Sequence, residues 1–142
     1  MLGAIIGDTV GSIYEFNNSK STKFELFSPN SSPTDDSVMS MAVAEWLLTD
    51  PERTQEKLEE SMLRWGKRYP HPLGGYGGAF CRWLFYPECL GGRHPYNSWG
   101  NGSAMRCSAC GWVAKTLKEA EELAQRSAEI THNHPEGIKG AQ

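Results

Sequence analysis

The chain has 142 residues, of which 39% are hydrophobic and 11% aromatic, and its net charge is −3 at pH 7. This length suits one domain with a buried core and is too short for two, so we treat residues 1–142 as one domain. The composition is that of a globular chain, and acidic and basic residues are interleaved. A disordered protein and a surface built for a nucleic-acid backbone are therefore excluded.

The first residues carry no signal for export. The apolar run from Leu2 to Ile6 is short, no basic segment precedes it, and Asp8 interrupts it. No stretch is long enough to span a bilayer, so no membrane partner is expected. We therefore expect a cytoplasmic protein whose four cysteines are reduced.

The hydrophobic pattern is helical almost throughout, which predicts an all-α fold of about six to seven helices with long functional loops. The first helix is expected over residues 2–15. Gly3, Gly7 and Gly11 lie four residues apart on it, and Glu15 continues that row. Because each glycine costs a helix about 1 kcal/mol, we expect another backbone or a ligand to come close to this face.

A polar loop over residues 16–33 follows and is typical of a functional lid. The second helix is expected over residues 34–48. The third is expected to begin with Asp50 as its N-cap and Pro51 as its first residue. Its apolar positions are spaced by four, three and four residues: Leu58, Met62, Trp65 and Tyr69.

Glycines and helix caps divide the second half of the chain. A glycine-rich loop over residues 74–78 precedes a short aromatic helix, and a second loop leads to Asn101. A helix is expected over residues 103–115. Thr116 and Glu119 form a capping box for a helix that runs to about Thr131, and Pro135 opens a short last helix.

The triplet Thr34-Asp35-Asp36 has two interpretations. Threonine is a good N-cap, and acids in a first helical turn complement the helix dipole, so the triplet is explained as an ordinary helix start. A hydroxyl and two carboxylates in one turn are also hard oxygen ligands for Mg²⁺ or Mn²⁺. Glu15 is the nearest acid that could join them, whereas Asp8 is expected to make a structural hydrogen bond.

Three further segments contain candidate binding residues. The glycines of residues 74–78 lack the pattern of a Walker A loop, but glycine amides before a helix can hold phosphate, and a flexible turn is the alternative. Trp99, between Ser98 and Asn101, suits stacking on a base or sugar, or else it is a core residue. His132 lies at a helix junction, where a cap or a core histidine is the usual explanation.

Cys107 and Cys110 form a CxxC pair within an apolar helical stretch. A zinc site would need two more ligands from elsewhere in the chain. We favour packing of small buried side chains and keep a zinc-binding interaction module as an alternative.

Together these motifs resemble the ADP-ribosylglycohydrolase family. The resemblance rests on five blocks in order, which begin at Gly7, Thr34, Gly74, Asn101 and Thr131 and cover essentially the whole chain. It implies an all-α fold and a hydrolase that uses two divalent ions, Mg²⁺ or Mn²⁺, to cleave the bond between ADP-ribose and a protein side chain or small acceptor.

The resemblance also implies roles for individual residues. Metal ligands would be Thr34, Asp35 and Asp36, and Glu15 would lie on a mobile flap and be needed for activity along with both aspartates. ADP-ribose would contact Gly75, Tyr76, Gly77, Gly78, Ser98, Trp99, Asn101, Gly102 and His132.

The chain departs from the family in one respect. Family members carry a second acidic motif, Asp-x-Asp-Thr, in a carboxy-terminal half, and this chain has no aspartate after Asp50. We therefore expect this chain to be the amino-terminal part of such a domain and to bind metal weakly. Exposed apolar helix faces would then lead to a homo-oligomer or to contact with the missing half. A truncated ADP-ribose-binding protein, or a structural relative such as the crystallins of this family, is the alternative.

Overall fold

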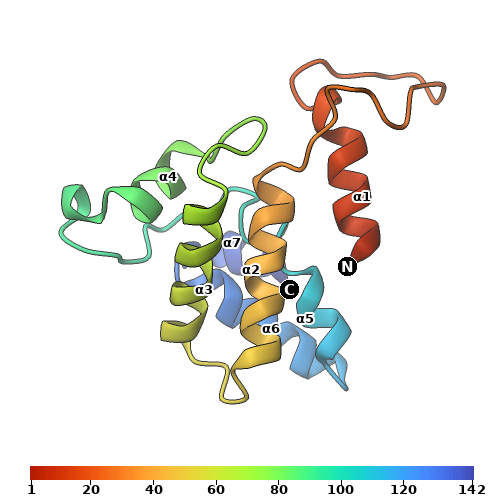
Figure 1. The fold of residues 1–142 in the computed structure, drawn as a ribbon. Coiled ribbons are helices and arrows are strands. Elements are labelled where there is room, and N and C mark those ends of the chain that lie inside the picture. Colours follow the sequence, from red (N-terminus) through yellow and green to blue (C-terminus); the bar gives the residue numbers. More distant parts are fainter.

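The computed structural model describes residues 1–142 and contains seven α-helices, two short 3-10 helices and no sheet. This confirms the all-α fold (Figure 1). In chain order the elements are α1 (Leu2–Gly11), η1 (Ser12–Tyr14), α2 (Asp35–Thr49), α3 (Gln55–Arg68), α4 (Gly78–Phe85), η2 (Pro87–Leu90), α5 (Ser108–Val113), α6 (Leu117–Glu129) and α7 (Pro135–Ala141).

Helix α2 is the centre of the fold. It packs against α3 and α5, while α6 and α7 lie behind it (Figure 1). Met39, Val43 and Trp46 are fully buried, and buried residues lie on all sides of the helix. A helix that is apolar all round needs neighbours on every face, so the position of α2 follows from its sequence. Its N-terminal end points toward the loops that form the candidate site.

Helix α1 stands beside this bundle and has no buried residue (Figure 1). It continues through η1 to Tyr14, close to the predicted end of the first helix. The glycine row does not meet a partner within the chain, because a Cβ at Gly3, Gly7 or Gly11 would have no atom within 4 Å. The loop over 16–33 has no helix, as predicted.

The predicted start of the third helix is wrong. Asp50 instead closes a turn, in which its carboxylate accepts the amide of Thr54 at 2.7 Å and the hydroxyl of Thr54 at 2.8 Å. Thr54 then becomes the N-cap, and α3 begins at Gln55. Residues 51–54 are held outside the helix because the Asp50 side chain takes the hydrogen bonds that would otherwise form its first turn.

The predicted helix over residues 103–115 is also too long, because only Ser108–Val113 is helical. The preceding residues form turns that contact α6 and α7. Ser103 donates its hydroxyl to the carbonyl of Gly137 at 2.7 Å, and Arg106 donates to the carbonyl of Ser127 at 2.6 Å. These side-chain hydrogen bonds connect the turns to α6 and α7.

Candidate functional site

The N-terminus of α2 is built from residues of two helices. Thr34 is the N-cap, and its hydroxyl accepts the amide of Asp36 at 3.2 Å, as the helix-start interpretation predicts. The carboxylate of Asp8, from α1, accepts the amide of Thr34 at 2.9 Å and its hydroxyl at 2.6 Å. It also accepts the amide and hydroxyl of Ser37. The structural role predicted for Asp8 is confirmed, and it fixes α1 against α2.

Asp35 and Asp36 lie in the first turn of α2 and are half-buried. Burial raises the pKa of Asp35 to about 6, and the charges of Asp36, Glu15 and Asp8 add to this shift. Burial, with the charges of Asp8 and Glu15, also raises the pKa of Asp36. Four carboxylates therefore repel one another around the start of α2, and a bound cation would relieve that repulsion.

An acidic pocket of about 360 Å³ opens between the end of α1, η1 and the start of α2. Its polar lining includes Glu15, Thr34, Asp36 and Asn101. Glu15 follows η1 directly, so the helical extension of α1 returns this carboxylate toward the triplet. Gly74 of the glycine-rich loop lies against it, because a Cβ there would be 3.2 Å from the Glu15 carboxylate.

A second pocket of about 240 Å³ lies on the other side of Asn101, which lines both pockets. We call it the glycine pocket, and it extends from Asp35 to the start of α4 and to His132. Six of the predicted binding residues line it: Gly77, Gly78, Ser98, Asn101, Gly102 and His132. The two pockets therefore join the predicted metal ligands to the predicted ADP-ribose contacts.

Two glycines lie against His132. A Cβ on Gly102 would lie 3.0 Å from Cε1 and Nε2 of the ring, so a side chain there would displace the ring. A Cβ on Gly137 would lie 2.5 Å from the Ser98 carbonyl oxygen and 3.1 Å from the His132 Cβ, so a side chain there would clash with both residues. Tyr96 packs on the same ring at a centroid distance of 5.8 Å.

Three predicted residues lie outside the glycine pocket. Gly75 is exposed, and its φ of +76° favours glycine. Tyr76 donates its hydroxyl to the carbonyl of Tyr69 at 2.7 Å and packs on Phe80. Trp99 is 75% exposed, so the core alternative is wrong. Their contact with ADP-ribose stays a prediction.

Tyr96 and Arg106 line the glycine pocket and were not predicted as site residues. Tyr96 is in a loop without a recognisable pattern. The sequence does contain a signal for Arg106, because it is the one charged residue in a run of small and apolar residues. It is 1% exposed, and its Nε has no hydrogen-bond partner.

The donor set at the start of α2 fits a divalent cation in its chemistry. The oxygens of Thr34, Asp35 and Asp36 are hard ligands, and the charges of neighbouring carboxylates add to the burial that raises the pKa values of both aspartates. Nowhere in the chain do three histidine, cysteine, aspartate or glutamate side chains lie close enough together to complete a metal site. The triplet therefore offers one side of a coordination shell.

The cysteine pair has the character of packing rather than of a metal ligand set. All four cysteines have free thiols. Burial raises the pKa of Cys110 to about 12 and also raises that of Cys107. Cys110 belongs to the buried apolar core, and Cys107 packs against that core. The cytoplasmic location inferred from reduced cysteines stays a prediction.

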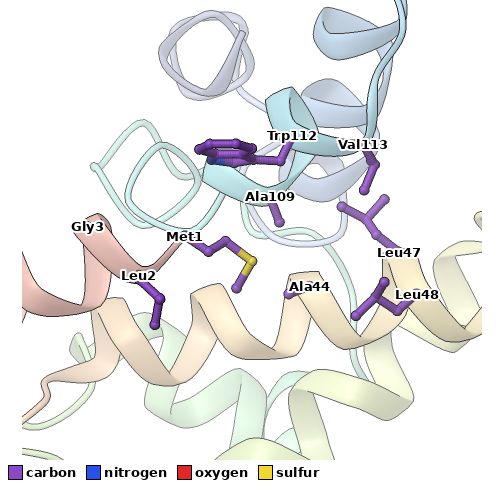
Figure 2. Close-up of a pocket in the computed structure, with 9 residues that line it drawn as sticks. All are labelled: Met1, Leu2, Gly3, Ala44, Leu47, Leu48, Ala109, Trp112 and Val113. Carbon is purple, nitrogen blue, oxygen red and sulfur yellow. The ribbon is translucent and has the colours of Figure 1, made fainter.

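An apolar pocket of about 600 Å³ lies elsewhere on the chain. It lies between α1, α2 and α5, and side chains of all three helices surround it (Figure 2). Leu48 is 80% exposed and Trp112 76% exposed on this face. It offers no group for chemistry and is a surface for apolar contact. None of the helices has the length and apolar character needed to cross a membrane.

The chain is similar in sequence to a known protein family and to several of its members. The sequence profile of the ADP-ribosylglycohydrolase family matches residues 1–142. ADP-ribosylhydrolase ARH3 of Mus musculus is 28% identical over 99% of this chain and 45% of its own length. ARH3 of Homo sapiens is 28% identical over 99% of the chain and 46% of its own length. ARH3 of Gallus gallus is 30% identical over 76% of the chain and 32% of its own length. The chain thus spans less than half the length of these curated relatives.

Proposed function

Because this chain belongs to the ADP-ribosylglycohydrolase family, we propose that it forms part of a hydrolase that cleaves the glycosidic bond between ADP-ribose and a protein side chain or small acceptor. The observation that carries this proposal is the meeting of two pockets at Asn101. One is acidic and contains Glu15 and Asp36. The other is lined by glycines and His132, and suits a ligand with phosphates.

The glycine pocket would hold the diphosphate and adenosine side of ADP-ribose. Gly77 and Gly78 form the start of α4, and no side chain caps this end. Its free backbone amides and the positive end of the helix dipole favour phosphate oxygens. The exposed ring of Trp99 is available for stacking on the base, and His132 supplies a ring nitrogen.

The acidic pocket would hold the ribose and the scissile bond. Thr34, Asp35 and Asp36 would bind a divalent cation, Mg²⁺ or Mn²⁺. The Thr34 hydroxyl donates its hydrogen to Asp8 and accepts the Asp36 amide, which leaves one lone pair of its oxygen to act as a ligand. When bound, such a cation supplies positive charge that orients ribose hydroxyls and acidifies water. Affinity would be weak, because the chain provides only one side of the coordination shell.

Glu15 is the proposed general base. Hydrolysis of a glycosidic bond passes through an oxocarbenium-like state, which nearby carboxylates stabilise. Glu15 is exposed beside the acidic pocket and precedes the loop over 16–33, so it can reach a water on the open side of the ribose. The negative charges of Asp35 and Asp36 would face the positive charge that develops on the sugar.

Release of free ADP-ribose tests the proposal. The chain would be incubated with Mg²⁺ and proteins ADP-ribosylated on arginine or on serine. Release is expected, with Glu15→Gln inactive and the exposed loop variant Glu25→Gln active. Calorimetric binding of ADP-ribose without release from either substrate would contradict hydrolysis by this chain alone and support a non-catalytic binding protein.

The apolar pocket between α1, α2 and α5 supports a proposal about assembly. In the isolated chain, exposed Leu2, Leu48 and Trp112 would be covered by a second copy of the chain, in the place of the polypeptide that the longer relatives possess (Figure 2). Light scattering should therefore show an oligomer for the wild-type chain and a smaller species for Leu48→Glu. A monodisperse wild-type monomer would contradict self-association.

A further inference from the structure

The buried guanidinium of Arg106 is connected to the His132 ring through one side chain, that of Thr131. The Arg106 Nη2 donates to the carbonyl of Ser127 at 2.6 Å and to the Thr131 hydroxyl at 2.8 Å, which uses both of its hydrogens. The Thr131 oxygen lies 2.8 Å from Nδ1 of His132. All three side chains are at most 4% exposed. A continuous chain of hydrogen bonds therefore runs from the guanidinium to the imidazole.

The direction of the last hydrogen bond follows from counting donors and acceptors. The Thr131 hydroxyl has one hydrogen, which can go to His132 Nδ1 or to the carbonyl of Ala128 at 3.4 Å. That carbonyl already accepts the amides of Thr131 at 3.0 Å and of His132 at 2.7 Å, so both its lone pairs are used. The hydrogen is thus assigned to the shorter contact, the one with Nδ1 at 2.8 Å, which makes Nδ1 the unprotonated acceptor.

We propose that Arg106 and Thr131 are positioning residues that fix His132 in the tautomer with its proton on Nε2. Nε2 makes no hydrogen bond within the chain. It lies on the ring edge that faces Gly102, at the glycine pocket. The pocket then presents an N–H donor to an oxygen that can only accept, such as a phosphate oxygen of the ligand. This inference rests on the proposed function for the identity of that ligand.

The surroundings of His132 keep its ring neutral, so the Nε2–H donor belongs to an imidazole and not to a charged imidazolium. Burial, together with the charge of Arg106, lowers the pKa of His132 to about 4. Burial lowers the pKa of Arg106 itself to about 10, so the guanidinium remains charged at neutral pH. A neutral imidazole next to a permanent cation has one unprotonated ring nitrogen that can accept a hydrogen bond. The Thr131 hydroxyl donates to this nitrogen.

Nitrogen-15 NMR of the imidazole side chains in the ligand-free full chain at pH 8 tests this inference. His132, assigned by its loss in His132→Gln, should show an unprotonated Nδ1 and a protonated Nε2. Thr131→Ser keeps the hydroxyl and should keep this pattern, whereas Thr131→Val should give a mixture of tautomers. His134 is an internal control, because its Nδ1 accepts the amide of Glu136 at 3.1 Å independently of Thr131.

A protonated Nδ1 in the wild-type chain, or an unchanged pattern in folded Thr131→Val, would overturn the inference. Calorimetry with ADP-ribose adds a second measurement, in which Thr131→Val should bind at least tenfold more weakly than Thr131→Ser. Equal affinities of these two variants would also contradict it. The NMR result needs no ligand, so failure of the wild-type chain to bind ADP-ribose would count against the proposed function alone.

Discussion

Replacing Asp35 by asparagine should stabilise the metal-free chain at pH 8. The carboxyl has a pKa of about 6 in the folded chain against an ordinary value of 3.8, chiefly because of burial and then because of Asp36 and Glu15. A shift of about two pKa units corresponds to about 3 kcal/mol, and solvent screening of this half-buried group reduces it to roughly 1–2 kcal/mol. Loss of the favourable helix-dipole interaction removes about 0.5 kcal/mol, which leaves a net gain of about 1 kcal/mol.

The pH dependence follows from the sign of the shift. Since the pKa of Asp35 is raised on folding, its favourable contribution is complete below pH 3.8 and is lost as the pH rises through about 6. Thermal unfolding should therefore show similar midpoints for wild type and Asp35→Asn near pH 3.8. At pH 8 the variant should unfold about 4 °C higher.

A matched control separates charge crowding from the helix start itself. Glu56 is an exposed acid in the first turn of α3. Glu56→Gln removes a similar dipole interaction without relieving any carboxylate cluster, so it should leave the midpoint unchanged or slightly lower. A lower midpoint for Asp35→Asn than for wild type at pH 8 without metal would refute the claim that the carboxylates repel one another.

Two further substitutions test the contacts that build the site. Asp8→Ala removes the acceptor that joins α1 to α2 through Thr34, and urea unfolding should show a loss of about 2 kcal/mol; an unchanged midpoint and slope would contradict this role. Gly102→Ala places a Cβ 3.0 Å from the His132 ring and should weaken ADP-ribose binding about tenfold by calorimetry. Gly111→Ala, in open space on α5, should bind as wild type does, and equal affinity of both alanine variants would contradict the positioning of His132.

Local signals in the sequence predicted most of the helices. Thr34, Thr116 and His134 each cap the helix that follows, through hydrogen bonds to an amide two or three residues ahead. Such caps depend only on neighbouring residues and can be recognised without the fold. Asp50 carries the same signal, but its side chain closes a turn with Thr54, and Arg53 adopts a positive φ of 56° within it. Residue type alone does not distinguish these two uses of an aspartate.

The candidate site was predicted where it depends on motifs and missed where it depends on packing. The acidic triplet, Glu15 and the glycines are recognisable as short patterns. The partners of His132 are not, because Tyr96 and Arg106 reach it only after α6 and α7 fold back on the turns before α5. The residues before Ser108, where a longer helix was expected, also make such contacts with α6 and α7. Sequence patterns therefore indicate the ligands of the site better than the residues that orient them.

The glycine row of α1 gave a prediction that the chain alone does not satisfy. The spacing of Gly3, Gly7 and Gly11 indicated a close partner, yet nothing lies within 4 Å of the Cβ positions. Met1, Leu2 and Gly3, at the start of the same helix, line the apolar pocket (Figure 2). The row and the pocket share Gly3 and are both exposed, and both agree with the proposal that further polypeptide covers α1.

The most direct test of the account is to locate bound ADP-ribose on the chain. Amide chemical shifts of the ¹⁵N-labelled protein would be followed during titration with ADP-ribose in the presence of Mg²⁺. The largest changes are expected at Gly78, Asn101 and Gly102, around the two pockets that meet at the start of α2. Changes centred on Ala109 and Trp112 of the apolar pocket, or no changes at all, would contradict it.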